Sequence, residues 1–349
     1  MWFTKKPIVG LDIGSSCVKA IQLAPHRGSY RLVQMGIEYL PPETIIEGTI
    51  IAHLPIADAI NRIFTDYKIK SKYVCTSLSG HSVIVKKITL PYQRGEDINE
   101  TVRWESEQYI PYAFADVNLD FQLLAENPEA NSIDVLLAAV KKEKIAERVD
   151  VITMADKKTA IIDVDAFAVL NAYEINYQPS ASTTVALLNI GASLLNVTIV
   201  NGKDFVFTRH ISVGGNHYTD FLQKEFNLSW EDADHLKHGN PVSGVSAEEA
   251  AHIIQSVSEI IALEISKTFD FFKTSTNMST IDRMLVSGGS CHVPNLINLL
   301  SQKLNIPAEE FDSFRNISYD PNKFDPEHMR MVSPQMAIAV GLALRTMGD

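Results

Sequence analysis

"VGLDIGSSCVKAIQL", residues 9–23, places an apolar strand pattern, one carboxylate and a short polar turn next to one another. Its first five residues are typical of a buried strand with Asp12 near the end, and its last six return to an apolar pattern. The turn Gly14-Ser15-Ser16 lets consecutive backbone N–H groups point at an anion without side-chain clash. A carboxylate beside that anion is favourable if it holds a hydrated Mg²⁺, which needs few protein ligands. The stretch therefore predicts a strand–turn–strand unit for phosphate and metal.

A second stretch repeats this pattern in the middle of the chain. "TVALLNIGASLLNVTIVNG", residues 184–202, again has a hydrophobic strand, one polar residue, a small turn and a second apolar strand. Aligned with the first stretch, it places Asn189 over Asp12 and Gly191 over Gly14. This internal duplication predicts two similar units, one opening each half of the chain.

A third motif follows late in the chain. "VSGGSCHVPNL", residues 286–296, has the pattern of a strand, a glycine pair and the start of a helix. A single turn of the D-x-G-S type is common at strand ends and favours a nucleotide only weakly. Three such loops in this order favour a nucleotide held between two lobes, with the glycines of the third loop lying against the adenosine.

Composition limits the classes of function. The chain has 349 residues, 46% of them hydrophobic, and a formal net charge of −11, which argues against a large nucleic-acid-binding surface. Its three cysteines, Cys17, Cys75 and Cys291, are far apart, which favours a reduced, cytoplasmic setting. The ten histidines lack metal-ligand spacing. No apolar run of about 18 residues occurs, and no secretory signal or basic amphipathic tail, so we expect no direct membrane insertion.

The periodicity between the loops predicts a further unit. Residues 95–111 have the pattern of a charged amphipathic helix ended by Pro111, and a β-hairpin around 127–131 and another helix follow. The segment 90–158 therefore has the size of a small inserted subdomain.

The three loops in this order resemble those of the actin-like ATPase superfamily, which includes actin, heat-shock chaperones, sugar kinases and FtsA. From about residue 7 to 347, including the ending "VSPQMAIAVGLALR", the chain is similar to the PilM family of type IV pilus assembly proteins. The resemblance implies an α/β actin-like ATPase fold, with two lobes, a duplicated core and a small inserted FtsA-type subdomain. The resemblance implies that the first lobe consists of residues 1–89 and 159–182 with a closing helix 334–349. The insert would span residues 90–158. The second lobe would span residues 183–333, with an adenosine-side subdomain at about 216–283.

The resemblance also implies roles for individual residues, with ATP and Mg²⁺ as cofactors. Asp12 would organise Mg²⁺ through water. The phosphates would be lined by Gly14, Ser15, Ser16 and Lys19 from one lobe and by Asn189, Gly191, Ala192 and Ser193 from the other. A glycine pair, Gly214 and Gly215, follows the second loop. The adenosine would be contacted by Asp234, Lys237, Gly288, Gly289 and Ser290, although a solvated helix face explains Asp234 and Lys237 equally well.

One departure concerns hydrolysis. Superfamily members that hydrolyse ATP strongly carry an aspartate in the second loop, where this chain has Asn189. An amide lacks the negative charge that helps to hold metal or orient water. Asp165 lies near the position of a water-positioning acid, but it also suits the first turn of a helix for electrostatic reasons. We therefore expect ATP binding with weak or absent hydrolysis.

The function implied by the resemblance is that of a cytoplasmic ATP-binding adaptor in type IV pilus assembly, and hence in twitching motility. It would lie at the inner membrane through its partners, dock the cytoplasmic N-terminal peptide of a PilN-like membrane protein in a groove beside residues 90–158, and contact other platform and motor proteins. An oligomer is possible. The alternatives are an FtsA-like division scaffold, which would use a C-terminal amphipathic helix, and a sugar or acid kinase, which would need an acceptor pocket with a catalytic aspartate. A chaperone would need a separate substrate domain.

Overall fold

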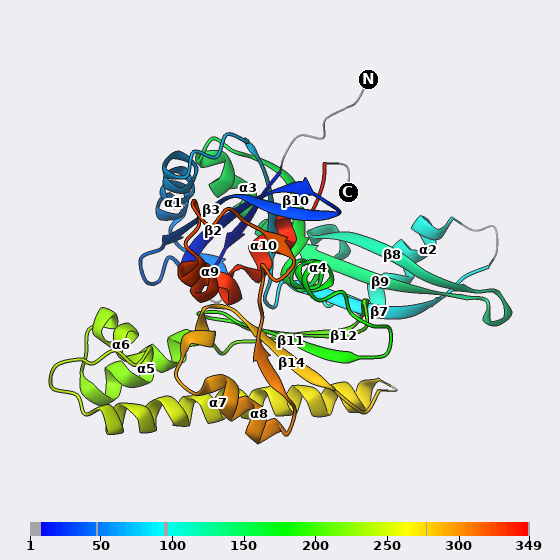
Figure 1. Cartoon of the computed structure of the whole chain (residues 1–349). Coiled ribbons are helices and arrows are strands. Elements are labelled where there is room, and N and C mark those ends of the chain that lie inside the picture. Colours follow the sequence, from blue (N-terminus) through cyan, green and yellow to red (C-terminus); the bar gives the residue numbers. More distant parts are fainter. Residues whose placement is uncertain (1–7, 47, 94–96, 277, 348–349) are drawn as a thin grey trace.

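The computed structural model describes residues 8–46, 48–93, 97–276 and 278–347. Two large sheets lie one above the other with helices between and around them, and a small third sheet projects to one side (Figure 1). The space between the two large sheets is where the predicted loops meet.

The first large sheet has the strand order β10-β6-β1-β2-β3-β16. Its strands are β1 (Val9–Ile13), β2 (Cys17–His26), β3 (Ser29–Tyr39), β6 (Tyr73–Leu78), β10 (Lys158–Val164) and β16 (Ile317–Ser318). A separate two-stranded hairpin is formed by β4 (Ile45–Ile46) and β5 (Thr49–Ile50).

The second large sheet has the order β13-β12-β11-β14-β15. Its strands are β11 (Thr184–Ile190), β12 (Leu195–Asn201), β13 (Asp204–Ile211), β14 (Arg283–Ser287) and β15 (Ala308–Glu310). The order and direction of these five strands match those of β3-β2-β1-β6-β10: each copy has two antiparallel pairings on one side of its central strand and two parallel pairings on the other. The duplicated core expected from the two repeated stretches is confirmed.

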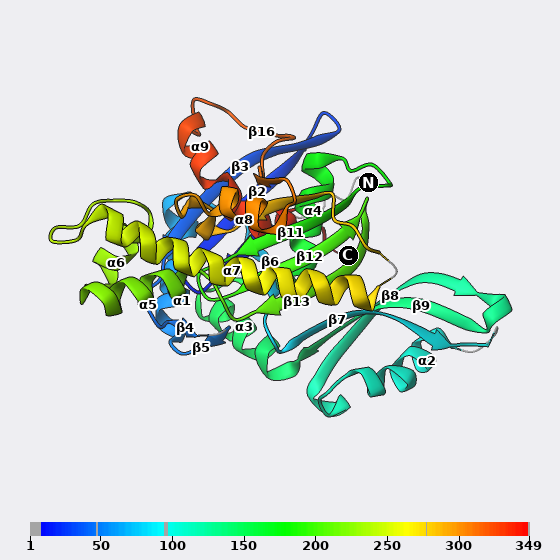
Figure 2. The same cartoon turned by 90° about the horizontal axis from the view of Figure 1, so that it is seen from below.

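The helices form layers on these sheets. The helix between the sheets that follows β10 is α4 (Asp165–Tyr177), and it lies beside α10 (Ala337–Ala343). The outer face of the first sheet packs against α1 (His53–Asp66) and α3 (Lys142–Met154). The second lobe contains α5 (Gly215–Phe226), α6 (Trp230–Lys237), α7 (Ala247–Ser275) and α8 (Leu296–Leu304), and α7 runs across the outer face of the second sheet (Figure 2). Among the described residues the remaining helical segments are α2 (Ile98–Glu105), α9 (Pro326–Val332) and five 3₁₀ turns at Ser106–Tyr109, Phe114–Asp116, Pro128–Ala130, Gly289–His292 and Ser333–Met336.

The unbroken apolar run of β11 follows from burial on both faces. Val185 and Leu187 pack in one cluster with residues of α4 and α10, whereas Ala186 and Leu188 pack in another with residues of α7. Because side chains alternate along a strand, a strand covered on both sides needs apolar residues at every position.

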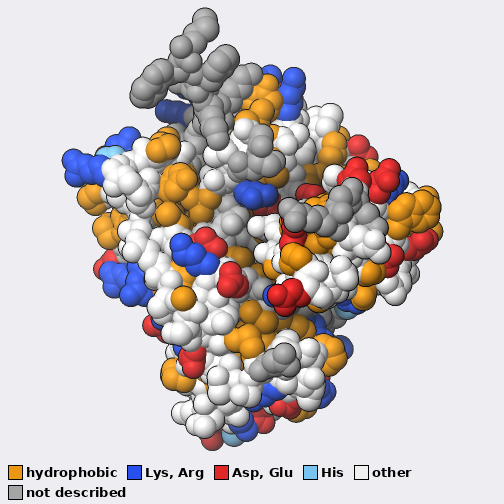
Figure 3. Space-filling model, turned by 90° about the vertical axis from the view of Figure 1, so that its right-hand side faces the viewer, with side chains coloured by type: hydrophobic (Ala, Val, Ile, Leu, Met, Phe, Trp, Pro, Cys, Tyr) orange, Lys and Arg blue, Asp and Glu red, His pale blue; other side chains and the backbone are white. Residues whose placement is uncertain are grey.

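The small third sheet is ordered β7-β9-β8, with β7 (Val83–Pro91), β8 (Val117–Asn127) and β9 (Ser132–Lys141). The predicted hairpin around 127–131 is the β8–β9 turn. The chain leaves the first sheet at Ser79-Gly80, after the end of β6, and Gly80 adopts a φ of +85° there. Figure 3 views the molecule from the side on which this sheet projects.

The elements at the borders of the predicted insert differ from expectation. The boundary placed between residues 89 and 90 falls inside β7, all of which pairs with β9. The predicted helix 95–111 is shorter: α2 (Ile98–Glu105) begins after Asp97, whose side chain accepts from the Asn99 amide, and residues 95 and 96 lie outside the described residues. At the other border, α3 packs Val151 and Ile152 into the core of the first sheet. The division into lobes remains a prediction.

No described helix is both long and apolar enough to cross a membrane.

Candidate functional site

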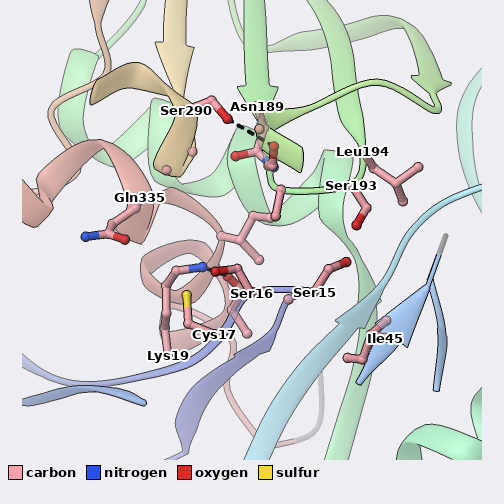
Figure 4. Close-up of a pocket in the computed structure, with 18 of the residues that line it drawn as sticks. Ser15, Ser16, Cys17, Lys19, Ile45, Asn189, Ser193, Leu194, Ser290 and Gln335 are labelled. Atoms are coloured by element: carbon pink, nitrogen blue, oxygen red, sulfur yellow. Dashed lines mark hydrogen bonds and ion pairs between the residues drawn. The ribbon is translucent and has the colours of Figure 1, made fainter. Parts of the chain in front are cut away.

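The two repeated turns face each other across a cavity of about 500 Å³ between the lobes (Figure 4). Each turn is closed by an equivalent backbone hydrogen bond: the Gly14 amide donates to Cys17 O at 3.0 Å, and the Gly191 amide donates to Leu194 O at 2.9 Å. The duplication therefore extends to the conformation of the loops.

Nearly all predicted site residues line this cavity. Gly214 does not: a Cβ on it would lie 2.5 Å from Gly191 O and 2.6 Å from Ala192 O, so it packs against the backbone of the second loop. The lining contains Asp12, Gly14, Ser15, Ser16, Lys19, Asp165, Asn189, Gly191, Ala192, Ser193, Gly215, Asp234, Lys237, Gly288, Gly289 and Ser290.

The charge of Asp12 is balanced by Lys19. The two residues lie opposite each other on β1 and β2, are 7% and 9% exposed, and have Nζ and Oδ2 separated by 2.8 Å. Burial alone would lower the pKa of Lys19, but the Asp12 carboxylate and, after it, the Cys17 side chain together outweigh burial, so the pKa is raised. Lys19 thus holds the carboxylate at the end of β1 while lining the cavity.

The second copy replaces this ion pair by two amides. Asn189 and Asn196 occupy the equivalent opposed positions on β11 and β12. The Asn189 Oδ1 accepts from Ser287 Oγ at 3.2 Å, so the side chain is held in place by the neighbouring strand. The repeat has therefore exchanged a charged pair for a neutral one at the same place.

Asp165, the first residue of α4, also reaches the cavity. Burial raises the pKa of Asp165 and the Asp12 carboxylate raises it further, while the hydroxyls of Ser77 and Ser79 and the charge of Arg148 act in the opposite direction. Asp165 thus faces a second acid and hydrogen-bond donors. The electrostatic preference of an acid for the first turn of a helix does not account for these surroundings.

A second buried lysine, Lys237 of α6, lines the cavity. Lys237 is 7% exposed, its Nζ donates to Thr219 Oγ1 at 3.1 Å, and it pairs with Asp234. The structure therefore buries Lys237 instead of leaving it on a solvated helix face. Burial, followed by the charge of Lys237, lowers the pKa of the neighbouring His238.

The lining suits a magnesium nucleotide. Within the described part of the chain, the amides of Ser15, Ser16, Ala192 and Ser193 donate to no other residue, which leaves them for an anion. A Cβ on Gly289 would meet nothing within 4 Å, so space remains beside the third loop. The described residues contain no cluster of three or more acidic, histidine or cysteine side chains for a metal, but Mg²⁺ often keeps its waters and uses one or two carboxylates plus phosphate.

Sequence reasoning missed the lining residues that other elements bring in. Ser77 and Ser79 lie at the carboxyl end of β6, which is parallel to β1, and such strand ends favour ligand sites, so a signal existed. Ile13, Cys17, Leu194 and His292 lie within the three quoted stretches, and His235 and His238 adjoin predicted residues, so a local signal existed for them too. No local signal was available for the others, which are Tyr39, Ile45, Gly48, Arg148, Asn240, Gln335 and Ile338.

Comparison with solved structures identifies the fold as that of the actin-like ATPases. The ethanolamine utilization protein EutJ from Carboxydothermus hydrogenoformans superposes with a TM-score of 0.59 at 12% identity, over 97% of this chain and 89% of EutJ. MreB5 of Spiroplasma citri bound to AMPPNP superposes with a TM-score of 0.53 at 14% identity, over 96% of this chain and 94% of MreB5. The predicted fold class is confirmed.

A more similar structure is the PilM–PilN type IV pilus biogenesis complex, with a TM-score of 0.87 and 25% identity over 98% of both chains. The family model of the type IV pilus assembly protein PilM matches residues 10–347. The chain belongs to the PilM family of type IV pilus assembly proteins.

Proposed function

We propose that this chain is a nucleotide-loaded adaptor of type IV pilus assembly, which binds ATP with Mg²⁺ in the interlobe cavity. The observation that carries this proposal is the pair of matching turns whose unpartnered amides face one cavity, with Asp12 at its edge. The fold shared with MreB5, which was solved with AMPPNP, supports it. The FtsA-like scaffold and the kinase are not favoured, since the family match covers nearly the whole chain.

The roles at the cavity follow from the chemistry of its residues. The amides of Ser15, Ser16, Ala192 and Ser193 would bind phosphate oxygens. Bound Mg²⁺ would offset the phosphate charge, with Asp12 holding its water shell. Lys19 supplies positive charge at the same end, and Lys237 with Asp234 and the third loop would hold the adenosine. Because the amide of Asn189 cannot accept a proton from water, we expect hydrolysis to be weak or absent.

Exchanging the ion pair for the amide pair of the second copy tests the binding site. Asp12→Asn alone should cost about 3–5 kcal/mol of stability, because Lys19 stays buried without its partner. The double variant Asp12→Asn with Lys19→Asn copies Asn189 and Asn196, so it should recover much of the lost stability. It should still fail to bind Mg-ATP. For the wild type, Mg-ATP at a hundredfold its Kd should add about 2.7 kcal/mol of stability, measured by thermal unfolding.

The control for this pair is the exposed ion pair Lys72–Asp156, with Nζ and Oδ2 3.1 Å apart. Changing both of its residues to Asn should leave stability and the Mg-ATP effect unchanged, because exposed pairs contribute about 0–1 kcal/mol. An undiminished Mg-ATP effect in the Asp12/Lys19 double variant would refute the role given to these residues.

We further propose that a PilN-like inner-membrane protein docks its cytoplasmic N-terminal peptide beside the small sheet, and thereby brings the chain to the membrane near other platform and motor proteins. A groove of about 940 Å³ lies there, walled by β8, β9, α4 and the β12–β13 turn. Apolar side chains line it together with charges of both signs, which suits an extended peptide that inserts alternate side chains into pockets. Its lining includes Lys87, Asp120, Leu124, Leu136, Asp163, Phe167, Leu170, Lys203, Phe205 and Arg345. PilN is the partner in the complex that this fold resembles.

Two adjacent leucines on β8 test the groove. Leu124 lines it and is 41% exposed, whereas Leu123 is 36% exposed and does not line it. We expect Leu124→Ser to weaken binding of a labelled peptide copying the PilN-like N-terminus at least about tenfold, roughly 1.4 kcal/mol. Leu123→Ser should change the affinity less than about twofold. Fluorescence polarisation measures both, and equal losses in the two variants would place the peptide elsewhere.

A further inference from the structure

Arg148, in the middle of α3, lies outside the repeated core and lines the interlobe cavity. It is 6% exposed, and its Nη1 donates to Ile13 O at 2.9 Å. Ile13 is the last residue of β1 and immediately precedes Gly14, so this bond fixes the entry into the first loop.

The guanidinium has a donor that is accepted by no other described residue. Among the described residues, the Arg148 Nε has no hydrogen-bond partner although it is buried. A buried donor without a partner costs free energy, and at the edge of a cavity it points to a ligand that satisfies the group. An arginine offers five N–H donors in a planar fork that suits phosphate oxygens.

The charges around Arg148 fit the same role. Asp165, Asp12 and Glu147 are the acids that act on it. Asp12 is already neutralised by Lys19, so Arg148 is a cation that offsets Asp165 at the phosphate end of the cavity. Removing this cation would leave the phosphate end more negative and would repel an anionic ligand.

The same helix contacts two other parts of the molecule. Ile145, one turn before Arg148, lines the groove beside the small sheet. The Nζ of Lys144 donates to Thr49 Oγ1 at 3.1 Å, and Thr49 belongs to the β4–β5 hairpin whose Ile45 and Gly48 line the cavity. Helix α3 therefore joins the groove, the hairpin and the first phosphate loop.

We propose that Arg148 is a positioning residue of the nucleotide cavity. It fixes the first loop through Ile13 and offers the N–H donors that it does not use for Ile13 to the phosphates farthest from the adenosine. Through α3 it also connects the cavity to the groove. This role rests on the proposed nucleotide-binding function. On this proposal Arg148 gives the cavity its preference for a nucleoside triphosphate over a monophosphate, because only the longer phosphate chain adds negative charge near Arg148.

The test is isothermal titration of wild type, Arg148→Gln and Arg148→Lys with Mg-ATP and with AMP. Arg148→Gln should weaken Mg-ATP binding at least about tenfold and AMP binding less than about twofold, which a merely structural role would not separate. Arg148→Lys should recover part of the Mg-ATP affinity, since it restores the charge but not the planar fork. Because Arg148→Gln leaves Asp165 uncompensated, the variant Arg148→Gln with Asp165→Asn, which keeps the charge balanced, is measured alongside.

Hydrogen exchange supplies the second readout. In the wild type, Mg-ATP should slow amide exchange in both loops, in α3 and in the groove strand β9, whereas in Arg148→Gln the protection of α3 and β9 should be lost. Equal weakening of Mg-ATP and AMP, or unchanged Mg-ATP affinity in all variants, would overturn the role of Arg148 alone. A wild type that binds no Mg-ATP would overturn the proposed function and this role with it.

Discussion

Gly289→Phe is expected to abolish nucleotide binding while leaving the fold intact. Gly289 is exposed, lines the interlobe cavity, and a Cβ on it would meet nothing within 4 Å. A phenylalanine there has room in the free protein, so the free energy of unfolding should change by less than about 0.5 kcal/mol. The ring would fill the space beside the third loop that the adenosine needs, and we expect Mg-ATP affinity to fall at least about a hundredfold, ~2.8 kcal/mol.

The measurement is isothermal titration with Mg-ATP, paired with urea unfolding of the same samples. Gly289→Ala is the graded control, since a methyl group should lower the affinity much less than the ring does. Tripolyphosphate provides a second control, because it lacks the adenosine and should bind wild type and Gly289→Phe equally. Full Mg-ATP affinity in Gly289→Phe would show that the adenosine does not lie beside the third loop.

Gly341→Ala is expected to cost at least about 3 kcal/mol of stability, although replacing glycine by alanine inside a helix normally stabilises the helix by about 1 kcal/mol. A Cβ on Gly341 would lie 1.7 Å from Ala168 O and 2.4 Å from Ala168 C. Both contacts are with the backbone of α4, which cannot turn away as a flexible side chain could. On the other side of α10, a Cβ on Gly10 would lie 2.2 Å from Ala339 O, so α10 is also pressed against β1.

Urea unfolding followed by circular dichroism measures this effect. Gly289→Ala is the matched glycine substitution, at a site with free space, and its stability should stay close to that of the wild type. Since Asp165 begins α4 and Ile338 of α10 lines the cavity, a displacement of these helices should also weaken Mg-ATP binding. A stabilised Gly341→Ala would mean that α4 and α10 do not cross this closely.

The parts of the site that could be predicted from the sequence are local. Each repeated stretch forms a hairpin from neighbouring residues, so its strand pattern and turn residues determine its conformation without the rest of the chain. The pairing of Asp12 with Lys19 was within reach too, because a hairpin that turns at residues 14–16 places them opposite each other. The sequence instead suggested phosphate contact alone for Lys19.

The parts that could not be predicted depend on contacts between distant segments. Arg148 meets Ile13 across 135 positions of the sequence, and nothing near Arg148 indicates a cavity. The helical pattern of residues 142–154 does not reveal that Val151 and Ile152 pack on the first sheet whereas Ile145 packs beside the small one. Gly341 likewise reads as an ordinary small residue in a closing helix, and only the crossing of α10 with α4 explains why a side chain is excluded.

The most direct test of the central claim is a crystal structure of this chain grown with Mg²⁺ and a non-hydrolysable ATP analogue. We expect the phosphates to lie between residues 14–16 and 191–193, with the magnesium ion on the Asp12 side and the adenosine beside Gly289 and Lys237. An analogue bound at another surface, or no analogue between these two loops at a saturating concentration, would contradict it.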